Sequence, residues 1–177
     1  MHLRPILLTT TTILAAGLLS GCFLDPGSHR QAMTAVNRFR NASVRVKTAV
    51  DDAYGYAIFP EVGKGGAVFG GALGKGRVYE RGEFVGRSKV VQGSFGLQLG
   101  GQIYSELILF QDRAAIEDFK RGNFELAAQA SAVAVVFGAS VDVPYRKGVA
   151  VLTMAKGGLM YEASVGGQKF SFTRAYR

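Results

Sequence analysis

Side chains that carry nucleophilic or metal chemistry are scarce in this sequence. Among 177 residues there are one cysteine, Cys22, and two histidines, of which His29 follows shortly after that cysteine. Because these groups are so few, the sequence excludes a nucleophile–histidine catalytic set and a metal site built from histidine and cysteine. The acidic pairs Asp51–Asp52 and Glu117–Asp118 are adjacent in sequence, and we expect them to be solvated charges. The sequence therefore predicts a protein that is not an enzyme and uses no metal or cofactor.

Long apolar runs are also missing. The uncharged run Pro5–Leu19 follows Arg4 and is shorter than the about 20 residues of a membrane-spanning helix. It leads into Leu19-Ser20-Gly21-Cys22, the layout of a secretory signal peptide with a small-residue cleavage site. An exported cysteine with no disulfide partner in the chain is left unexplained unless it is modified.

The Leu-Ser-Gly-Cys ending resembles the lipobox of bacterial lipoproteins, which implies acylation of Cys22 and cleavage before it. We expect residues 1–21 to be a lipoprotein signal peptide and residues 22–27 a lipidated tether. The alternatives are an ordinary signal peptide with a chance cysteine, or a short anchor. Phe23 stands where the inner-membrane retention signal of enteric lipoproteins has aspartate, so we expect an outer-membrane anchor that faces the periplasm.

The remaining residues, 28–177, are enough for one domain with a core. The chain is 48% hydrophobic and only 19% charged, which argues against disorder. Its net charge of +8 suits an acidic partner. Because an exported protein meets few nucleic acids, anionic phospholipids or other acidic envelope polymers are the expected partners. Moderate basicity that only keeps the protein soluble is the alternative.

Hydrophobic periodicity predicts a helix from the N-cap Ser28 to about Val50, with a basic side that includes Arg38 and Arg45. After it, Gly-rich turns separate short strands, and Asp112 is a plausible N-cap for a helix to Lys120. A second short helix is expected within 124–132. The expected strands are 54–59, 66–72, 77–81, 84–91, 94–99, 103–110, 133–141, 149–154, 159–165 and 169–173. The fold class is therefore α+β: a strongly curved or closed antiparallel sheet with an N-terminal amphipathic helix and one or two short helices in the middle.

From Tyr54 onward the chain resembles the SYLF domain, a lipid-binding module of eukaryotic trafficking proteins and bacterial lipoproteins. The resemblance rests on segments that follow one another in order: 53–60, 62–66, 74–79, 96–102, 122–125 and 156–162. It implies affinity for acidic lipid, whereas the actin partner of fungal members is not expected in a bacterial envelope. Many members carry Trp-Ser-x-Pro where this chain has Phe84-Val85-Gly86-Arg87, and this chain has no tryptophan.

Two Gly-rich segments, Gly63–Gly66 and Gly74–Arg77, are either hairpin turns or loops that cradle phosphate. Neither matches the nucleotide-binding P-loop pattern. Around them cations outnumber acids, so projecting hairpins would form a basic patch. The candidate lipid-binding residues are Lys64, Lys75, Arg77, Arg81, Arg87 and Lys89, together with Arg38 and Arg45 on the helix.

Gln102 and Glu106 lie on the most apolar strand and form a possible buried polar site. Glu106 either lines a ligand cavity with a raised pKa or accepts hydrogen bonds from backbone N–H groups or an arginine. Three functions follow from the sequence. The first is a lipid-anchored module that binds anionic phospholipid, the second an envelope protein that binds another protein or has a structural role, and the third a carrier of a small apolar ligand.

Overall fold

The computed structural model describes residues 28–66, 69–95, 102–122, 124–125, 132–157 and 167–175. The expected signal peptide, Cys22 and the tether lie outside these residues. The helices are α1 (His29–Ala42), α2 (Val44–Asp52) and α3 (Arg113–Lys120). The strands are β1 (Gly55–Gly66), β2 (Phe69–Glu80), β3 (Glu83–Phe95), β4 (Gln102–Phe110), β5 (Phe124–Glu125), β6 (Val133–Ala134), β7 (Val149–Gly157) and β8 (Gln168–Arg174). The fold class is α+β, as expected.

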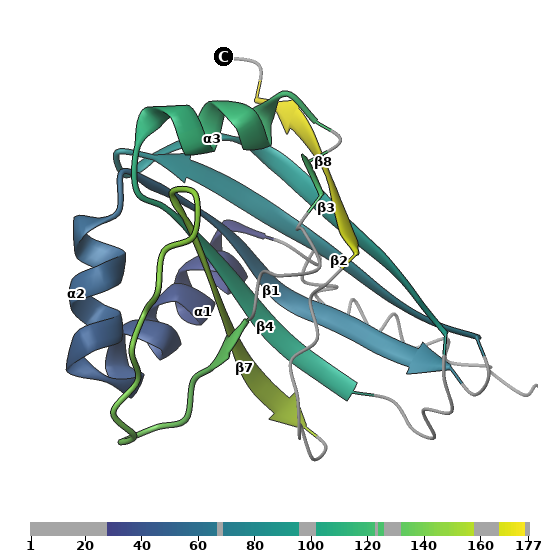
Figure 1. The fold of residues 1–177 in the computed structure, drawn as a ribbon, viewed down its shortest axis with the longest axis horizontal. Coiled ribbons are helices and arrows are strands. Elements are labelled where there is room, and N and C mark those ends of the chain that lie inside the picture. The colour runs from purple at the N-terminus through teal and green to yellow at the C-terminus, as the bar shows by residue number, and fades with distance from the viewer. Residues whose placement is uncertain are drawn as a thin grey trace, which may run out of the picture.

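One sheet contains all eight of these strands, in the order β5-β8-β3-β2-β1-β4-β7-β6 (Figure 1). The sheet is mixed, not antiparallel as predicted, because β6 runs parallel to β7. Residues 135–148 connect these two strands, and a parallel pair needs such a long return. The prediction of a closed sheet is wrong for the described strands, because β5 and β6 are the two edge strands and do not pair with each other. The sheet is nevertheless strongly curved: Gln168 on β8 hydrogen-bonds Glu106 on β4, although three strands separate β8 from β4.

The curved sheet divides the core into two. On the outer side, α1 and α2 pack over β1, β4 and β7, where Phe39 and Val46 meet Leu107 and Leu152. On the inner side, α3 packs into one end of the curve. There Phe119 contacts both Phe110 and Phe170, and Phe170 contacts Phe59. The rings meet at tilted angles, with the centroids of the contacting rings 5.1–5.5 Å apart.

The predicted helix from Ser28 to Val50 is two helices in the structure. The Ser28 hydroxyl caps α1 by accepting from the Gln31 N–H at 3.3 Å. Ser43 is extended (φ −158°, ψ 144°) and interrupts the helical backbone. The break redirects the chain, so that Phe39 of α1 and Val46 of α2 enter the same cluster over the curved sheet.

Other predictions met mixed outcomes. Asp112 caps α3 as expected, since its Oδ1 accepts from the Ala115 N–H at 2.9 Å. Residues 69–72 and 77–80 of the predicted strands 66–72 and 77–81 are parts of the single strand β2, whereas Gly66 ends β1 and residues 67–68 lie outside the described residues. The predicted helix in 124–132 begins instead as β5. Of the predicted strand 133–141, only 133–134 is a strand, since the chain then leaves the sheet for the return to β7. The predicted strand 159–165 and most of 94–99 lie outside the described residues.

Neither Gly-rich segment is a turn. Gly63–Gly66 lies within β1 and Gly74–Arg77 within β2. Glycine serves packing here: a Cβ on Gly76 would lie 2.6 Å from the Phe59 ring and 2.7 Å from the Ile58 carbonyl oxygen. On β3, a Cβ on Gly86 would lie 2.4 Å from the Thr173 carbonyl oxygen. The glycines on the inner face therefore give space to aromatic rings and to neighbouring backbone.

Replacing Gly86 with alanine should lower the free energy of unfolding by about 1–3 kcal/mol, because the new methyl group has no room against β8. Gly93→Ala on the same strand is the matched control, since a Cβ there meets nothing within 4 Å. Urea unfolding of both variants measures the difference. Equal stability of the two variants would contradict the packing role of Gly86.

Candidate functional site

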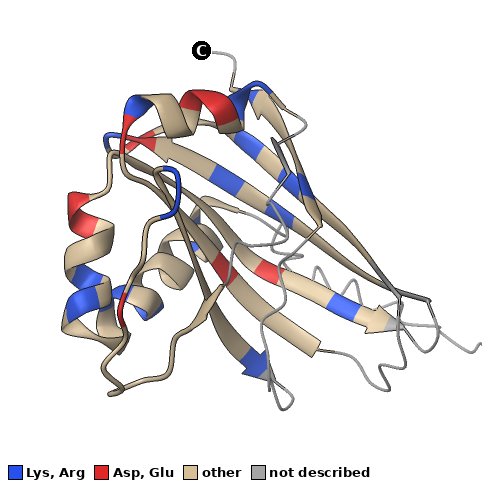
Figure 2. Cartoon of the chain, viewed as in Figure 1, with Lys and Arg blue, Asp and Glu red and all other residues tan. Residues whose placement is uncertain are grey.

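The outer face of β2 and β3 carries a ladder of cations beyond the edge of the helices. In the register of these strands Lys75 lies opposite Lys89, and Arg77 lies opposite Arg87. On β8, Lys169 lies opposite Val91 and is exposed on the same face. Figure 2 shows blue segments on adjacent strands in the half of the sheet that α1 and α2 leave uncovered. Lys75, Arg77, Arg87, Lys89 and Lys169 are called the basic ladder below.

Little negative charge compensates the basic ladder. Lys75, Arg87 and Lys89 are exposed, and none of them forms an ion pair with a described acid. Glu61 lies opposite Lys75 on β1, but its carboxylate pairs with Lys156 at 2.9 Å. Like charges directly opposite each other destabilise a sheet by roughly 0.2–1 kcal/mol per pair. The ladder therefore works against the stability of the fold.

Arg77 is held more firmly than the lysines. Its guanidinium carbon lies 4.1 Å from the centre of the Phe84 ring, a cation–π contact that fixes the side chain on the outer face. Phe84 is the first residue of the segment that replaces Trp-Ser-x-Pro, so here an aromatic ring at that position positions an arginine.

An apolar row continues the same face at the end of the ladder. It consists of Leu73, Val91 and Ile103, with exposed fractions of 66%, 52% and 51%. Leu73 pairs with Val91, and Gly63 pairs with both Leu73 and Ile103, so one line of residues crosses β3, β2, β1 and β4. Leu73 and Val91 are two positions from Lys75 and Lys89 and share their face. Apolar side chains beside cations suit the boundary between lipid headgroups and acyl chains.

Four predicted cations do not join the ladder: Lys64, Arg81 and Arg45, and Arg38 on α1. Lys64 lies opposite Ala72, which is buried on the inner side of the sheet, so Lys64 shares the inner face. Arg81 lies in the turn between β2 and β3, over the Tyr54 ring at 5.0 Å. Arg45 on α2 forms an ion pair with Asp142 in the loop before β7.

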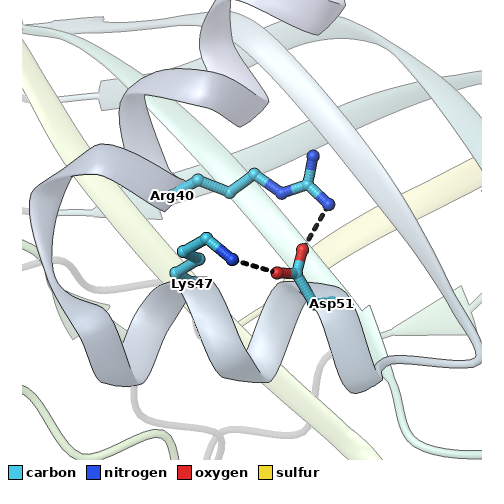
Figure 3. Close-up of polar contacts among 3 residues, drawn as sticks. All are labelled: Arg40, Lys47 and Asp51. Atoms are coloured by element: carbon cyan, nitrogen blue, oxygen red, sulfur yellow. Dashed lines mark hydrogen bonds and ion pairs between the residues drawn. The ribbon is translucent and has the colours of Figure 1, made fainter.

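Three of the five cations on α1 and α2 are ion-paired, whereas Arg30 and Arg38 form no ion pair with a described acid. Arg40 of α1 and Lys47 of α2 both contact Asp51, Lys47 at 2.7 Å (Figure 3). The hydrogen bond from Lys47, and then that from Arg40, hold the pKa of the Asp51 carboxyl below its ordinary value. Arg38 is half-buried on α1. The helices therefore present less uncompensated positive charge than the sheet does.

The buried polar site lies inside the curve. Glu106 is completely buried, and its Oε2 accepts from the Gln168 side-chain amide at 3.0 Å. The same amide nitrogen lies 3.3 Å from the Tyr104 hydroxyl. Burial raises the pKa of Glu106 to about 7, partly offset by the bond from Gln168. Glu106 is thus a hydrogen-bond acceptor, but for a glutamine rather than for an arginine; Gln102 is half-buried on the same face.

The described residues contain no group of three or more acidic, histidine or cysteine side chains placed to hold a metal ion. Within the same part of the chain, none of the helices has the length and hydropathy needed to cross a bilayer.

Comparison with known proteins gives the family. Residues 91–175 match the Ysc84 family model, described as "Las17-binding protein actin regulator". Residues 91–175 therefore form a domain of the Ysc84/SYLF family. The matched residues include α3, β8 and the contact between Glu106 and Gln168. The segments between residues 53 and 79 that carry part of the resemblance lie before the match.

A curated relative is similar over a longer stretch. "Beta cell expansion factor A" of Aeromonas veronii is 27% identical over 158 residues, which cover 83% of this chain and 59% of the relative. This chain therefore corresponds to little more than half of that protein's length.

Sequence reasoning missed two residues of these sites. Lys169 belongs to the ladder, and the alternation of Phe170 and Phe172 with polar residues already placed it on the polar side of its strand. Gln168, the partner of Glu106, had no local signal, because the two residues are far apart in sequence.

Proposed function

We propose that this SYLF domain binds the surface of anionic phospholipid membranes through the basic ladder and the apolar row. The observation that carries the proposal is the direct pairing of Lys75 with Lys89 and of Arg77 with Arg87 on an uncovered face. The match of residues 91–175 to the SYLF family adds support. The ladder supplies charge and the row supplies apolar contact, so the two together favour a membrane surface over a soluble anion.

The expected affinity follows from the charges. Each cation near an anionic bilayer contributes about 1 kcal/mol, and the contribution falls off within a Debye length, about 8 Å at physiological ionic strength. A ladder of five cations therefore gives useful affinity that salt weakens. The apolar row adds a part that salt does not weaken.

The proposal includes an anchor. Acylation of Cys22 with two or more chains would attach the protein stably to a membrane, by expectation the periplasmic face of the outer membrane. An anchored domain needs no lipid affinity of its own merely to stay at that membrane. The ladder would then orient the domain or reach a second anionic surface.

Removing two ladder charges tests the lipid contact. In a form lacking residues 1–22, Lys75→Gln/Lys89→Gln should weaken co-sedimentation with anionic phosphatidylglycerol vesicles by roughly 30-fold at low salt, since about 2 kcal/mol is lost. The variant should fold well, because the substitution also removes a like-charged cross-strand pair.

The matched control is Arg113→Gln/Arg121→Gln, which removes the same charge from the exposed surface of the α3 segment. It should bind like the unmodified protein. Equal loss in both variants would mean that net charge alone acts, and no loss in either would move the binding surface away from the ladder. Unchanged binding in zwitterionic vesicles or in high salt would exclude the electrostatic mechanism.

A single tryptophan can report the apolar row, since the chain has none of its own. Leu73→Trp should show a blue-shifted emission on adding anionic vesicles, because the indole enters the interfacial region. Val44→Trp, at the 81% exposed first residue of α2, should show no shift. The opposite pattern would assign the lipid contact to the helices and not to the sheet.

The anchor has its own test. Replacing Cys22 with serine should abolish incorporation of labelled palmitate and release the protein from the membrane fraction of a bacterial host. Unmodified chain serves as the reference. Palmitate incorporation that persists in Cys22→Ser would contradict acylation at this residue.

A further inference from the structure

One hydrogen-bonded contact connects the two arms of the curved sheet. β8 and β4 do not pair through their backbones, since β3, β2 and β1 lie between them. The Gln168 side-chain amide nevertheless reaches across the interior, at 3.0 Å from Glu106 Oε2 and 3.3 Å from the Tyr104 hydroxyl. We propose that Glu106 is a proton-operated latch: its neutral form tolerates burial and lets β8 stay against β4, whereas its ionised form favours an opened sheet in which water reaches the carboxylate.

Among the described residues, the Glu106 carboxyl receives one hydrogen bond, from the Gln168 side-chain amide. Its other oxygen, Oε1, is buried and has no hydrogen-bond partner in this part of the chain. An ionised Glu106 would therefore place buried negative charge on an oxygen that no described donor satisfies, and the single bond from Gln168 offsets only part of that cost.

No cation among the described residues pairs with Glu106: Lys64 shares the inner face, but it lies opposite Gln102, four residues along β4 from Glu106. The surrounding inner faces present Phe59 on β1, Val90 and Gln92 on β3, Val151 and Thr153 on β7, Gln168 and Phe170 on β8, and Ile116 and Phe119 on α3. The titratable group beside it in this set is Tyr104, and burial raises the pKa of that phenol, so it stays neutral. Burial likewise raises the pKa of Glu106 to about 7 from 4.5, with no charged group among its causes.

The direction of the pH dependence follows. The carboxyl has a higher pKa in the closed sheet than in an opened one, so closing takes up a proton. The contact is strongest below pH 4.5, where both forms are protonated. It weakens by up to tenfold in equilibrium constant per pH unit as the pH rises to about 7, and it changes little above that.

Loosening of the latch would also affect the outer face of the sheet. Gln168 points inward, and the next residue, Lys169, is part of the basic ladder. Movement of β8 would therefore shift one edge of the proposed lipid-binding surface. The latch itself is independent of that surface, because its bonds lie wholly inside the curve.

Hydrogen exchange of the β8 amides in the full chain tests the latch without any lipid. Protection factors of residues 168–174, corrected for intrinsic exchange and compared with those of α1, should fall by 10- to 100-fold between pH 5 and pH 8. Glu106→Gln should keep β8 protected at pH 8 and remove the pH dependence, since a neutral amide can still accept from Gln168. Glu61→Gln removes a carboxylate from the exposed surface of β1 and should leave the pH dependence unchanged.

Gln168→Ala should lower β8 protection at both pH values, and urea unfolding at pH 5 verifies that this variant folds. Should it fail to fold, Glu106→Gln and Glu61→Gln alone decide. Protection of β8 that is constant from pH 5 to 8 in the unmodified chain would overturn the proposal, as would the same pH dependence in Glu106→Gln.

Discussion

The curvature of the sheet is the constraint on which the other features depend. It requires close approach of neighbouring strands on the inner face, and glycine allows that approach at Gly76 and Gly86. The space so released is filled by Phe59 and Phe172, and the ring series from Phe170 to Phe119 joins the sheet to α3. Because the curve brings β8 within hydrogen-bond distance of β4, a polar contact can form between strands that never pair.

Curvature also separates two surfaces of opposite character. The outer side over β1, β4 and β7 is covered by α1 and α2, and the ion pairs of Asp51 and Asp142 neutralise much of the charge on those helices. On the outer side of β2 and β3, the described helices leave Lys75, Arg87 and Lys89 exposed, and the two lysines face one another. An acidic partner would relieve the repulsion among these cations. The adjoining apolar row favours a partner that has an apolar layer beneath its acidic groups, as a membrane surface has. This reasoning underlies the proposed lipid contact.

The sequence was informative where the signal is local. Asp112 and the following helix were predicted correctly because a cap and its N–H groups are neighbours in the chain. The alternation of Phe170 and Phe172 with polar residues assigned the two faces of β8. Most ladder residues were identified from the excess of cations over acids between Lys64 and Lys89, although Lys64 itself lies on the inner face.

Prediction failed where the cause is distant in sequence. Glycines within strands look like turns, because the ring that needs their space, such as Phe172 at Gly86, is far along the chain. The break at Ser43 follows from the shape of the sheet beneath the helices, which a helical period does not contain. The pairing of Glu106 with Gln168 depends on the curve itself.

β8 joins the two proposals, because consecutive residues on a strand point to opposite faces. Gln168 takes part in the inner contact and Lys169 in the outer ladder, so no change in the position of this strand can affect one without the other. An acylated Cys22 would keep the domain at a membrane whatever the state of the ladder. The ladder could then respond to pH through β8 without releasing the protein from its membrane. Because the tether alone would hold the protein there, weak and adjustable lipid contacts would be sufficient to orient the domain.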